Sequence, residues 1–151
     1  MERGEIGLIS TWNHNIILGF TDTVTVKLDF DNIYYKIVKH WAERTVNWFQ
    51  LEGYIILKSS KNCYHILFNR KVSWSENVRI MAWVAIESQI QKLKDYVLMQ
   101  CIKMSSTLRI SSKKGKPSPR IVYRFGKEDD QIHSFLSYRR KIKRIQRKIK
   151  N

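Results

Sequence analysis

The chain has 151 residues and a formal net charge of +15 at pH 7, with 28 lysines and arginines against 13 aspartates and glutamates. This length suits one domain that buries a core without a disulfide scaffold, and two cysteines are too few for a disulfide framework or a zinc knuckle. The charge indicates a polyanionic partner, and nucleic acid is favoured over a merely highly charged surface because the basic residues cluster.

The sequence contains no segment with the pattern of a membrane span or of a signal peptide. No apolar run approaches the roughly 20 residues that a membrane span needs, and residues 1–8 (MERGEIGL) lack the apolar region of a signal peptide. Cys63 and Cys101 belong to no C-x-x-C pair, as is typical of a reduced intracellular protein. We expect a cytoplasmic protein, in the host cytoplasm if it is virus-encoded, with no membrane partner.

The first clear element is a strand over residues 23–30. Residues 5–20 predict only a short strand or a loop that enters one. From residue 23 onward, apolar and polar residues alternate, which is the pattern of a strand with one buried face. The apolar set is Val24, Val26, Leu28 and Phe30. Asp29 and Asp31, at positions i and i+2, then point the same way from the opposite face.

A helix and a pair of strands follow. Residues 32–49 have helical spacing, with Asp31 or Asn32 as the N-cap and the tryptophans of this helix in the core. Residues 53–58 and 63–69 predict two strands joined by a polar turn. Ser59, Ser60 and Lys61 in this turn either present donors to phosphate oxygens or form an ordinary hairpin turn. If the pair lies beside the first strand, His65 comes close to both aspartates.

The second half of the chain is the more basic. Ser73 or Ser75 can cap a long helix over roughly residues 76–100. Two strands, 107–111 and 120–125, then predict a hairpin around a Lys/Gly/Pro loop. Its basic residues, which we expect to bind nucleic acid together with Arg109, are Lys113, Lys114, Lys116, Arg120 and Arg124.

The last segment predicts a basic amphipathic helix. Leu136, Ile142, Ile145 and Ile149 mark its apolar face. Such a helix can lie on nucleic acid, on an anionic membrane or on a protein partner, and nucleic acid is favoured here. We divide the chain into an α+β domain of residues 1–137 and a basic helical tail of residues 138–151. The candidate phosphate contacts of the tail are Arg139, Arg140, Lys143, Arg144 and Arg147.

The order strand, helix, strand, strand, helix, strand is that of a ferredoxin-like or RNA-recognition-motif fold. We therefore expect an α+β structure with an antiparallel sheet backed by two helices, plus the basic C-terminal helix. This fold supports both nucleotidyl transfer and passive nucleic-acid binding, so it does not decide between them.

Two motifs resemble the archaeo-eukaryotic primase superfamily, the primase-polymerases common in archaeal plasmids and viruses. The first family motif is a strand ending in D-x-D, and this chain has VKLDFD with Asp29 and Asp31. The second is a hairpin of the form S-x-x-x-x-H, and this chain has SSKNCYHILF with Ser59 or Ser60 and His65. The likeness covers about residues 23–72, and the remainder only in outline.

The resemblance implies a DNA-replication protein with a metal-dependent nucleotidyltransferase site acting on single-stranded DNA or RNA. Asp29, Asp31 and His65 would be the catalytic residues, and both aspartates would hold Mg²⁺ or Mn²⁺. Nucleoside triphosphate would be bound by Ser59, Ser60, Lys61, His65 and Arg109. Helicase or other replication subunits are further candidate partners.

One family feature is missing, and it keeps alternatives open. The third family motif supplies another metal-binding aspartate after the second helix, yet residues 103–118 contain no acid. Either Asp95 is the third ligand and the predicted helix ends early, or the catalytic set is incomplete. In the second case the chain is an inactive primase-fold subunit that binds nucleic acid and assists a replication complex. A small nuclease or rolling-circle initiation protein is less favoured; Tyr138 would be its residue to test.

Overall fold

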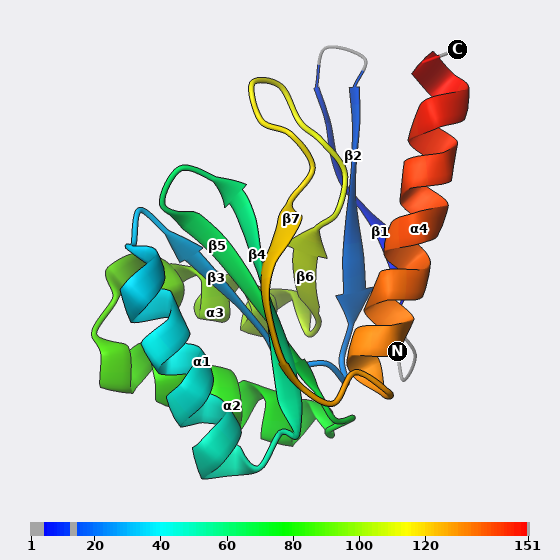
Figure 1. The fold of residues 1–151 in the computed structure, drawn as a ribbon. Coiled ribbons are helices and arrows are strands. Elements are labelled where there is room, and N and C mark those ends of the chain that lie inside the picture. Colours follow the sequence, from blue (N-terminus) through cyan, green and yellow to red (C-terminus); the bar gives the residue numbers. More distant parts are fainter. Residues whose placement is uncertain (1–4, 13–14, 151) are drawn as a thin grey trace.

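The chain folds into the predicted α+β structure, with helices packed on two antiparallel sheets (Figure 1). The computed structural model describes residues 5–12 and 15–150. Its strands are β1 (Glu5–Trp12), β2 (Asn15–Asp22), β3 (Lys27–Asp31), β4 (Gly53–Ser60), β5 (Cys63–Asn69), β6 (Ser106–Arg109) and β7 (Arg120–Gly126). Its helices are α1 (Tyr35–Phe49), α2 (Trp74–Ser88), α3 (Gln91–Lys103) and α4 (Gln131–Lys150). Within these residues, no helix is both long and apolar enough to cross a membrane.

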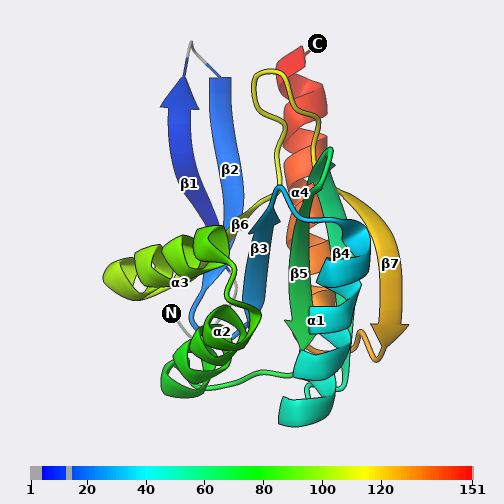
Figure 2. The same ribbon diagram turned by 90° about the vertical axis from the view of Figure 1, so that its left-hand side faces the viewer.

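The larger sheet has the strand order β3-β5-β4-β7, and the smaller one has the order β1-β2-β6. Figures 1 and 2 show α1 and α2 on one face of the larger sheet and α4 on the other. Because both faces are covered, β4 is apolar on consecutive residues, and Ile55, Ile56 and Leu57 are all buried.

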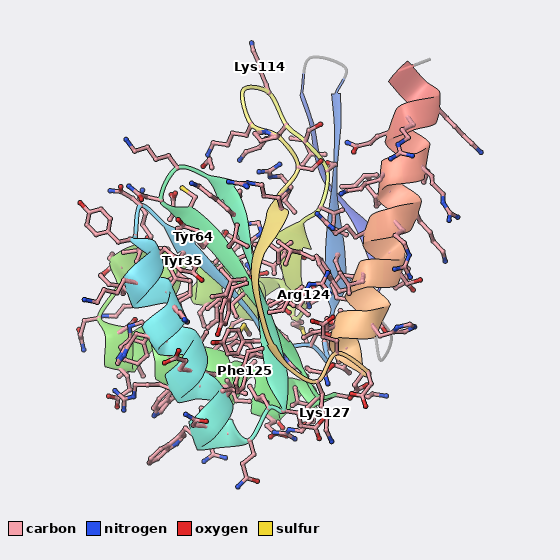
Figure 3. All side chains as sticks on the ribbon, in the orientation of Figure 1. Tyr35, Tyr64, Lys114, Arg124, Phe125 and Lys127 are labelled. Carbon is pink, nitrogen blue, oxygen red and sulfur yellow. The ribbon has the colours of Figure 1, made fainter. Side chains whose placement is uncertain are left out.

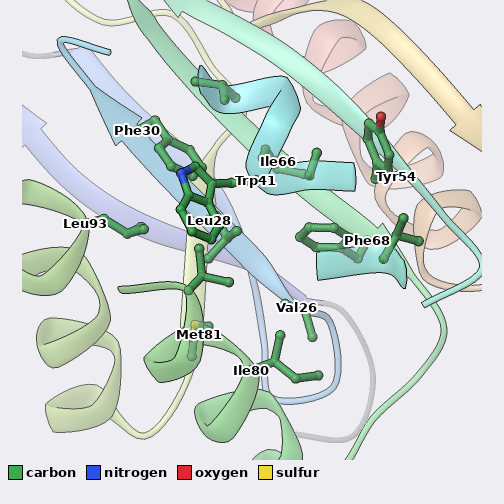
Figure 4. Close-up of a cluster of buried hydrophobic side chains, with 14 of the residues drawn as sticks. Val26, Leu28, Phe30, Trp41, Tyr54, Ile66, Phe68, Ile80, Met81 and Leu93 are labelled. Carbon is green, nitrogen blue, oxygen red and sulfur yellow. The ribbon is translucent and has the colours of Figure 1, made fainter. Parts of the chain in front are cut away.

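The first core lies between the larger sheet and helices α1 to α3 (Figure 4). Val26, Leu28 and Phe30 of β3 are buried there, which confirms the predicted alternation. Trp41 packs in this core as expected, but the side chain of Trp48 is 66% exposed, so the prediction that both tryptophans are buried is wrong for the second. It lies two helical turns further along α1 and stacks on Trp83 at the surface.

The second core joins α4 to both sheets. Its buried members are Phe20, Ile55, Leu57, Leu67, Leu108, Ile110, Ile132, Phe135 and Ile142. Ile132 and Phe135 anchor the start of α4, whereas Ile145 is exposed, so the buried face is rotated from the predicted one. Residue 137, where we divided domain from tail, lies inside this continuous helix.

A buried polar network fixes the two sheets relative to each other. The ammonium group of Lys27 on β3 donates to Asp22 Oδ1 on β2 at 2.6 Å and to Ser106 Oγ on β6 at 2.9 Å. Thr25 Oγ1 donates to the other oxygen of Asp22 at 2.6 Å and lies 2.7 Å from Gln131 Oε1 of α4. Burial lowers the pKa of Lys27 to about 8, although the carboxylate of Asp22 acts in the opposite direction.

Two predictions about the second half are wrong. The helix predicted over residues 76–100 is two helices, because Gln89 takes a left-handed conformation with φ of 58° and ends α2. Ser73 does cap α2, since its Oγ accepts from Glu76 N at 3.2 Å. The predicted strands near 107–111 and 120–125 exist but form no hairpin, because β6 pairs with β2 and β7 pairs with β4.

This pairing changes the edge of the larger sheet. A ferredoxin-like sheet would continue from β3 into the strand that follows the second helical region. Here that strand, β6, lies beside β3 but makes its ladder with β2 (Figure 2). The result is a junction between the two sheets, directly next to the end of β3 that carries the aspartates.

Candidate functional site

A cavity of about 360 Å³ lies at this junction. Strands β3 and β5 pair with Asp29 opposite His65 and Asp31 opposite Cys63, which confirms that the aspartates and the imidazole converge. The lining residues are Ile17, Asp29, Asp31, Ser59, Cys63, His65, Gln100, Lys103, Thr107, Arg109, Lys113 and Lys116. Acidic and basic groups from distant parts of the chain therefore face one space.

The two aspartates have different surroundings. Asp31 Oδ1 accepts from Cys63 Sγ at 2.8 Å, and its Oδ2 accepts from Lys92 Nζ at 3.1 Å. These two donors lower the pKa of Asp31, so it is an anion at neutral pH. Asp29 Oδ1 lies 3.6 Å from His65 Nε2, and its side chain is 38% exposed. This separation exceeds a hydrogen bond, so His65 does not hold Asp29 Oδ1, and the partly exposed carboxylate can accept a cation.

His65 is buried at the floor of the cavity. Burial lowers its pKa; Asp29 opposes this shift, and the nearby cations Arg109, Lys113 and Lys116 add to it. The imidazole is therefore neutral at pH 7 and can donate one ring N–H to a ligand.

The opposite wall of the cavity is basic. The guanidinium of Arg109 donates to the carbonyl oxygens of Ser111 and, at 3.0 Å, Pro117, so it holds the loop of residues 110–119 in place. Lys113 and Lys116 pair through their backbones at the base of the loop tip. Burial lowers the pKa of Lys113, and the positive charges of Lys116 and Arg109 lower it further. Three cations this close together repel one another, and a bound anion would relieve this repulsion. This wall of the cavity is therefore suited to an anion.

Part of this wall could not be predicted. Gln100 and Lys103 reach the cavity from α3, and both bind Thr107 of β6: Gln100 Oε1 accepts from its N–H at 3.0 Å, and Lys103 Nζ donates to its Oγ1 at 3.0 Å. Ile17 comes from β2. No local signal marks these residues, because they reach the site only through tertiary contacts, the packing of α3 beside β3 and the pairing of β6 with β2.

The turn between β4 and β5 contributes less than expected. Ser59 lines the cavity, and its Oγ donates to the carbonyl oxygen of Cys63 at 3.2 Å. Ser60 and Lys61 are not among the lining residues, and Lys61 lies exposed in the turn. The structure thus brings Ser59, His65 and Arg109 together and leaves the other two predicted nucleotide contacts outside.

Asp95 lies within α3 rather than at a helix end, and its Oδ1 accepts from Gln91 Nε2 at 2.9 Å. It lines an adjoining groove of about 370 Å³ that Asp29, Asp31 and Lys92 also line. Across residues 5–12 and 15–150, however, no three His, Cys, Asp or Glu side chains are arranged to hold a metal ion. The two carboxylates of β3 would therefore be the protein ligands of any Mg²⁺ or Mn²⁺ held here, with phosphate oxygens and water as its other ligands.

The basic residues outside the cavity form one surface over the loop of residues 110–119 and α4. Arg139 of α4 donates to the carbonyl oxygen of Pro119 at 3.2 Å, and Gln146 donates to Ser112 Oγ at 3.4 Å. Lys114 extends from the loop tip (Figure 3). The remaining predicted contacts on this side are Arg140, Lys143, Arg144 and Arg147 along α4 and Arg124 on β7, whereas Arg120 pairs with Lys58 and lies on the opposite face of the sheet. The loop is therefore shared between the cavity and this surface.

Comparison of the chain with protein-family models, with curated proteins and with solved structures found no match. Its function is therefore inferred from the geometry of the cavity and of the surface beside it.

Proposed function

We propose that this protein binds a nucleoside triphosphate in the cavity between β3 and β6 and transfers its nucleotidyl group to a nucleic-acid strand. This is the activity of a minimal primase-polymerase in DNA replication. One observation carries the proposal: two carboxylates and a neutral imidazole face a wall of cations across one cavity.

The residues divide into two groups by charge. Asp29 and Asp31 would hold Mg²⁺ or Mn²⁺, which would neutralise the reacting phosphates. Arg109, Lys113 and Lys116 bind the triphosphate oxygens from the other wall, and charge-assisted bonds from fixed donors favour the charge that develops during transfer. His65 donates an N–H to the same group from the floor.

In this proposal, the nucleic acid binds to the basic surface next to the cavity. Single-stranded DNA or RNA would contact the loop of residues 110–119 and α4 through its phosphates. Since the loop also lines the cavity, a strand bound there reaches the triphosphate. A helicase or other replication subunit would act at the same strand.

A second candidate is an inactive primase-fold subunit that binds nucleic acid and assists a replication complex. The environment of Asp31 favours this candidate, because both carboxylate oxygens of Asp31 already accept hydrogen bonds from Cys63 and Lys92. A rolling-circle initiation protein has less support, because Tyr138 packs on Phe20, with ring centroids 5.6 Å apart, and is not among the residues that line the cavity.

The test is binding of a fluorescent nucleoside triphosphate with and without Mn²⁺. We expect Mn²⁺ to tighten binding to the wild type, and the double variant Asp29→Ala/Asp31→Ala to lose this effect while it still binds oligonucleotide. Asp95→Asn is the matched control, since it removes a carboxylate charge from the adjoining groove. Equal binding with and without Mn²⁺ in all three proteins would identify a simple anion site and favour the inactive subunit.

A further inference from the structure

A second basic and aromatic surface lies on the other face of the larger sheet, between α1 and β7. Strand β7 is the edge strand of this sheet. We name this surface the α1–β7 surface; it consists of Lys39, Lys58, Arg120, Tyr123 and Phe125. On the α1 side it continues into a hollow of about 370 Å³ lined by Tyr35, Lys36, Lys39, His40 and Glu43.

One end of the α1–β7 surface carries two cations side by side. Lys58 on β4 and Arg120 on β7 are directly paired across the strands. Like charges in this position are destabilising, and a phosphate between them would remove the repulsion. Lys58 and Ser59 are adjacent in β4, so their side chains point to opposite faces of the sheet: Ser59 lines the cavity, and Lys58 belongs to the α1–β7 surface.

The other end is aromatic. Lys39 Nζ lies 4.4 Å from the ring centre of Tyr123. Two residues further along β7, Phe125 stacks on Tyr54 with ring centroids 5.3 Å apart, yet it remains 46% exposed. Figure 3 shows Phe125 at the lower part of β7, with Tyr35 and Tyr64 at the upper end of α1. Tyr54 also packs against Tyr123, and its hydroxyl is buried without a hydrogen-bond partner in the described part of the chain.

We infer that the α1–β7 surface binds a single nucleic-acid strand, with a base stacked on Phe125 and phosphates on Lys58 and Arg120. An exposed ring beside cations is what a single strand needs, because unpaired bases offer their faces while the backbone offers charge. Duplex bases are already stacked, and an acidic peptide would leave the exposed ring of Phe125 unused. This inference rests on the proposed function in taking nucleic acid as the partner.

The experiment measures the affinity of short oligo(dT) and oligo(U) by fluorescence anisotropy at several salt concentrations. Phe125→Leu keeps an apolar side chain but removes the ring, and we expect about 5- to 100-fold weaker binding with an unchanged salt slope. Phe125→Tyr should bind like the wild type. Arg120→Gln should reduce the salt slope by about 0.7, as for one lost phosphate contact. Trp48→Leu is the matched control, since it removes an exposed ring from the far part of α1.

A second measurement needs no variant of β7. Light-induced crosslinking of 4-thiothymidine oligonucleotides to the wild type, mapped by mass spectrometry, should place adducts on residues 120–126 as well as on α4. Adducts confined to α4 and residues 110–119, or equal affinity of Phe125→Leu and wild type, would overturn the inference. Absence of any oligonucleotide binding would overturn it too, and Mn²⁺-dependent triphosphate binding would then show separately whether the cavity is functional.

Discussion

The two sides of the larger sheet carry very different charge. On one side, α4 contains eight lysines and arginines and no acidic residue. On the other, helices α1 to α3 carry seven basic and four acidic residues over a greater length. The helical layer also exposes large apolar side chains, which include Trp48, Ile86, Leu98, Met99, Ile102 and Met104. The net charge of +15 is therefore concentrated rather than spread evenly, and much of it lies beside the cavity.

The largest effect is expected at the junction that holds the two sides together. Lys27→Met leaves the carboxylate of Asp22 buried without its cation, so we expect the free energy of unfolding to fall by about 3–5 kcal/mol in urea titrations. The double variant Asp22→Leu/Lys27→Met removes both charges and should recover much of this loss. A double variant as unstable as the single one would show that the network acts mainly through its other hydrogen bonds.

The difference in charge between the two sides of the sheet can be tested through the salt dependence of oligonucleotide binding. Arg140, Arg144 and Arg147 are exposed on α4, so changing all three to Gln should reduce the salt slope of oligonucleotide binding by about 2, at about 0.7 for each phosphate contact to a single strand. A matched triple change on the helical side, Lys71, Arg79 and Lys94 to Gln, removes the same charge and should leave the slope nearly unchanged. Equal slopes for both triple variants would mean that the total charge matters and its position does not.

The segment from β3 to β5 was largely predictable because its signals are local, whereas the two paired strands β1 and β2 were expected only as a short strand or a loop. Alternation located β3, turn residues located β4 and β5, and the i, i+2 spacing placed both aspartates on one face. The pairing of β3 with β5 then brought His65 opposite Asp29. Each of these steps depends on residues close together in the sequence or on one pairing of neighbouring strands.

The other wall of the cavity was not predictable for the opposite reason. β6 pairs with β2, which lies more than 80 residues earlier, and no periodic pattern identifies such a partner. The break between α2 and α3 falls at Gln89, a residue with good helix propensity and without the Gly or Pro that normally marks an end. Trp48 fits the helical spacing of a core residue, but it stacks on Trp83 at the surface and remains exposed.

A smaller effect concerns pH and the floor of the cavity. The folded-state pKa of His65 is below its ordinary value of 6.5, mainly because of burial. As the pH falls below 6.5, the unfolded chain takes up this proton before the folded one, so stability decreases until the folded state is protonated as well. His65→Gln should flatten this part of the stability curve in urea titrations at pH 5 to 8. His133→Gln, which removes an exposed histidine of α4, is the matched control.

The smallest expected effect distinguishes the two functions proposed for the cavity. Lys92 lies 3.1 Å from Asp31 Oδ2, on the helical side, and it competes with any metal ion at that carboxylate. Since this ion pair is largely exposed, its removal by Lys92→Gln should tighten Mn²⁺ binding only about two- to fivefold in calorimetric titrations. Lys94→Gln, two residues further along α3 and on a different face of the helix, is the control. If Lys92→Gln binds Mn²⁺ no better than wild type, Lys92 does not compete with the metal. If neither protein binds Mn²⁺, the aspartates act only as structural acceptors, and the inactive subunit is favoured.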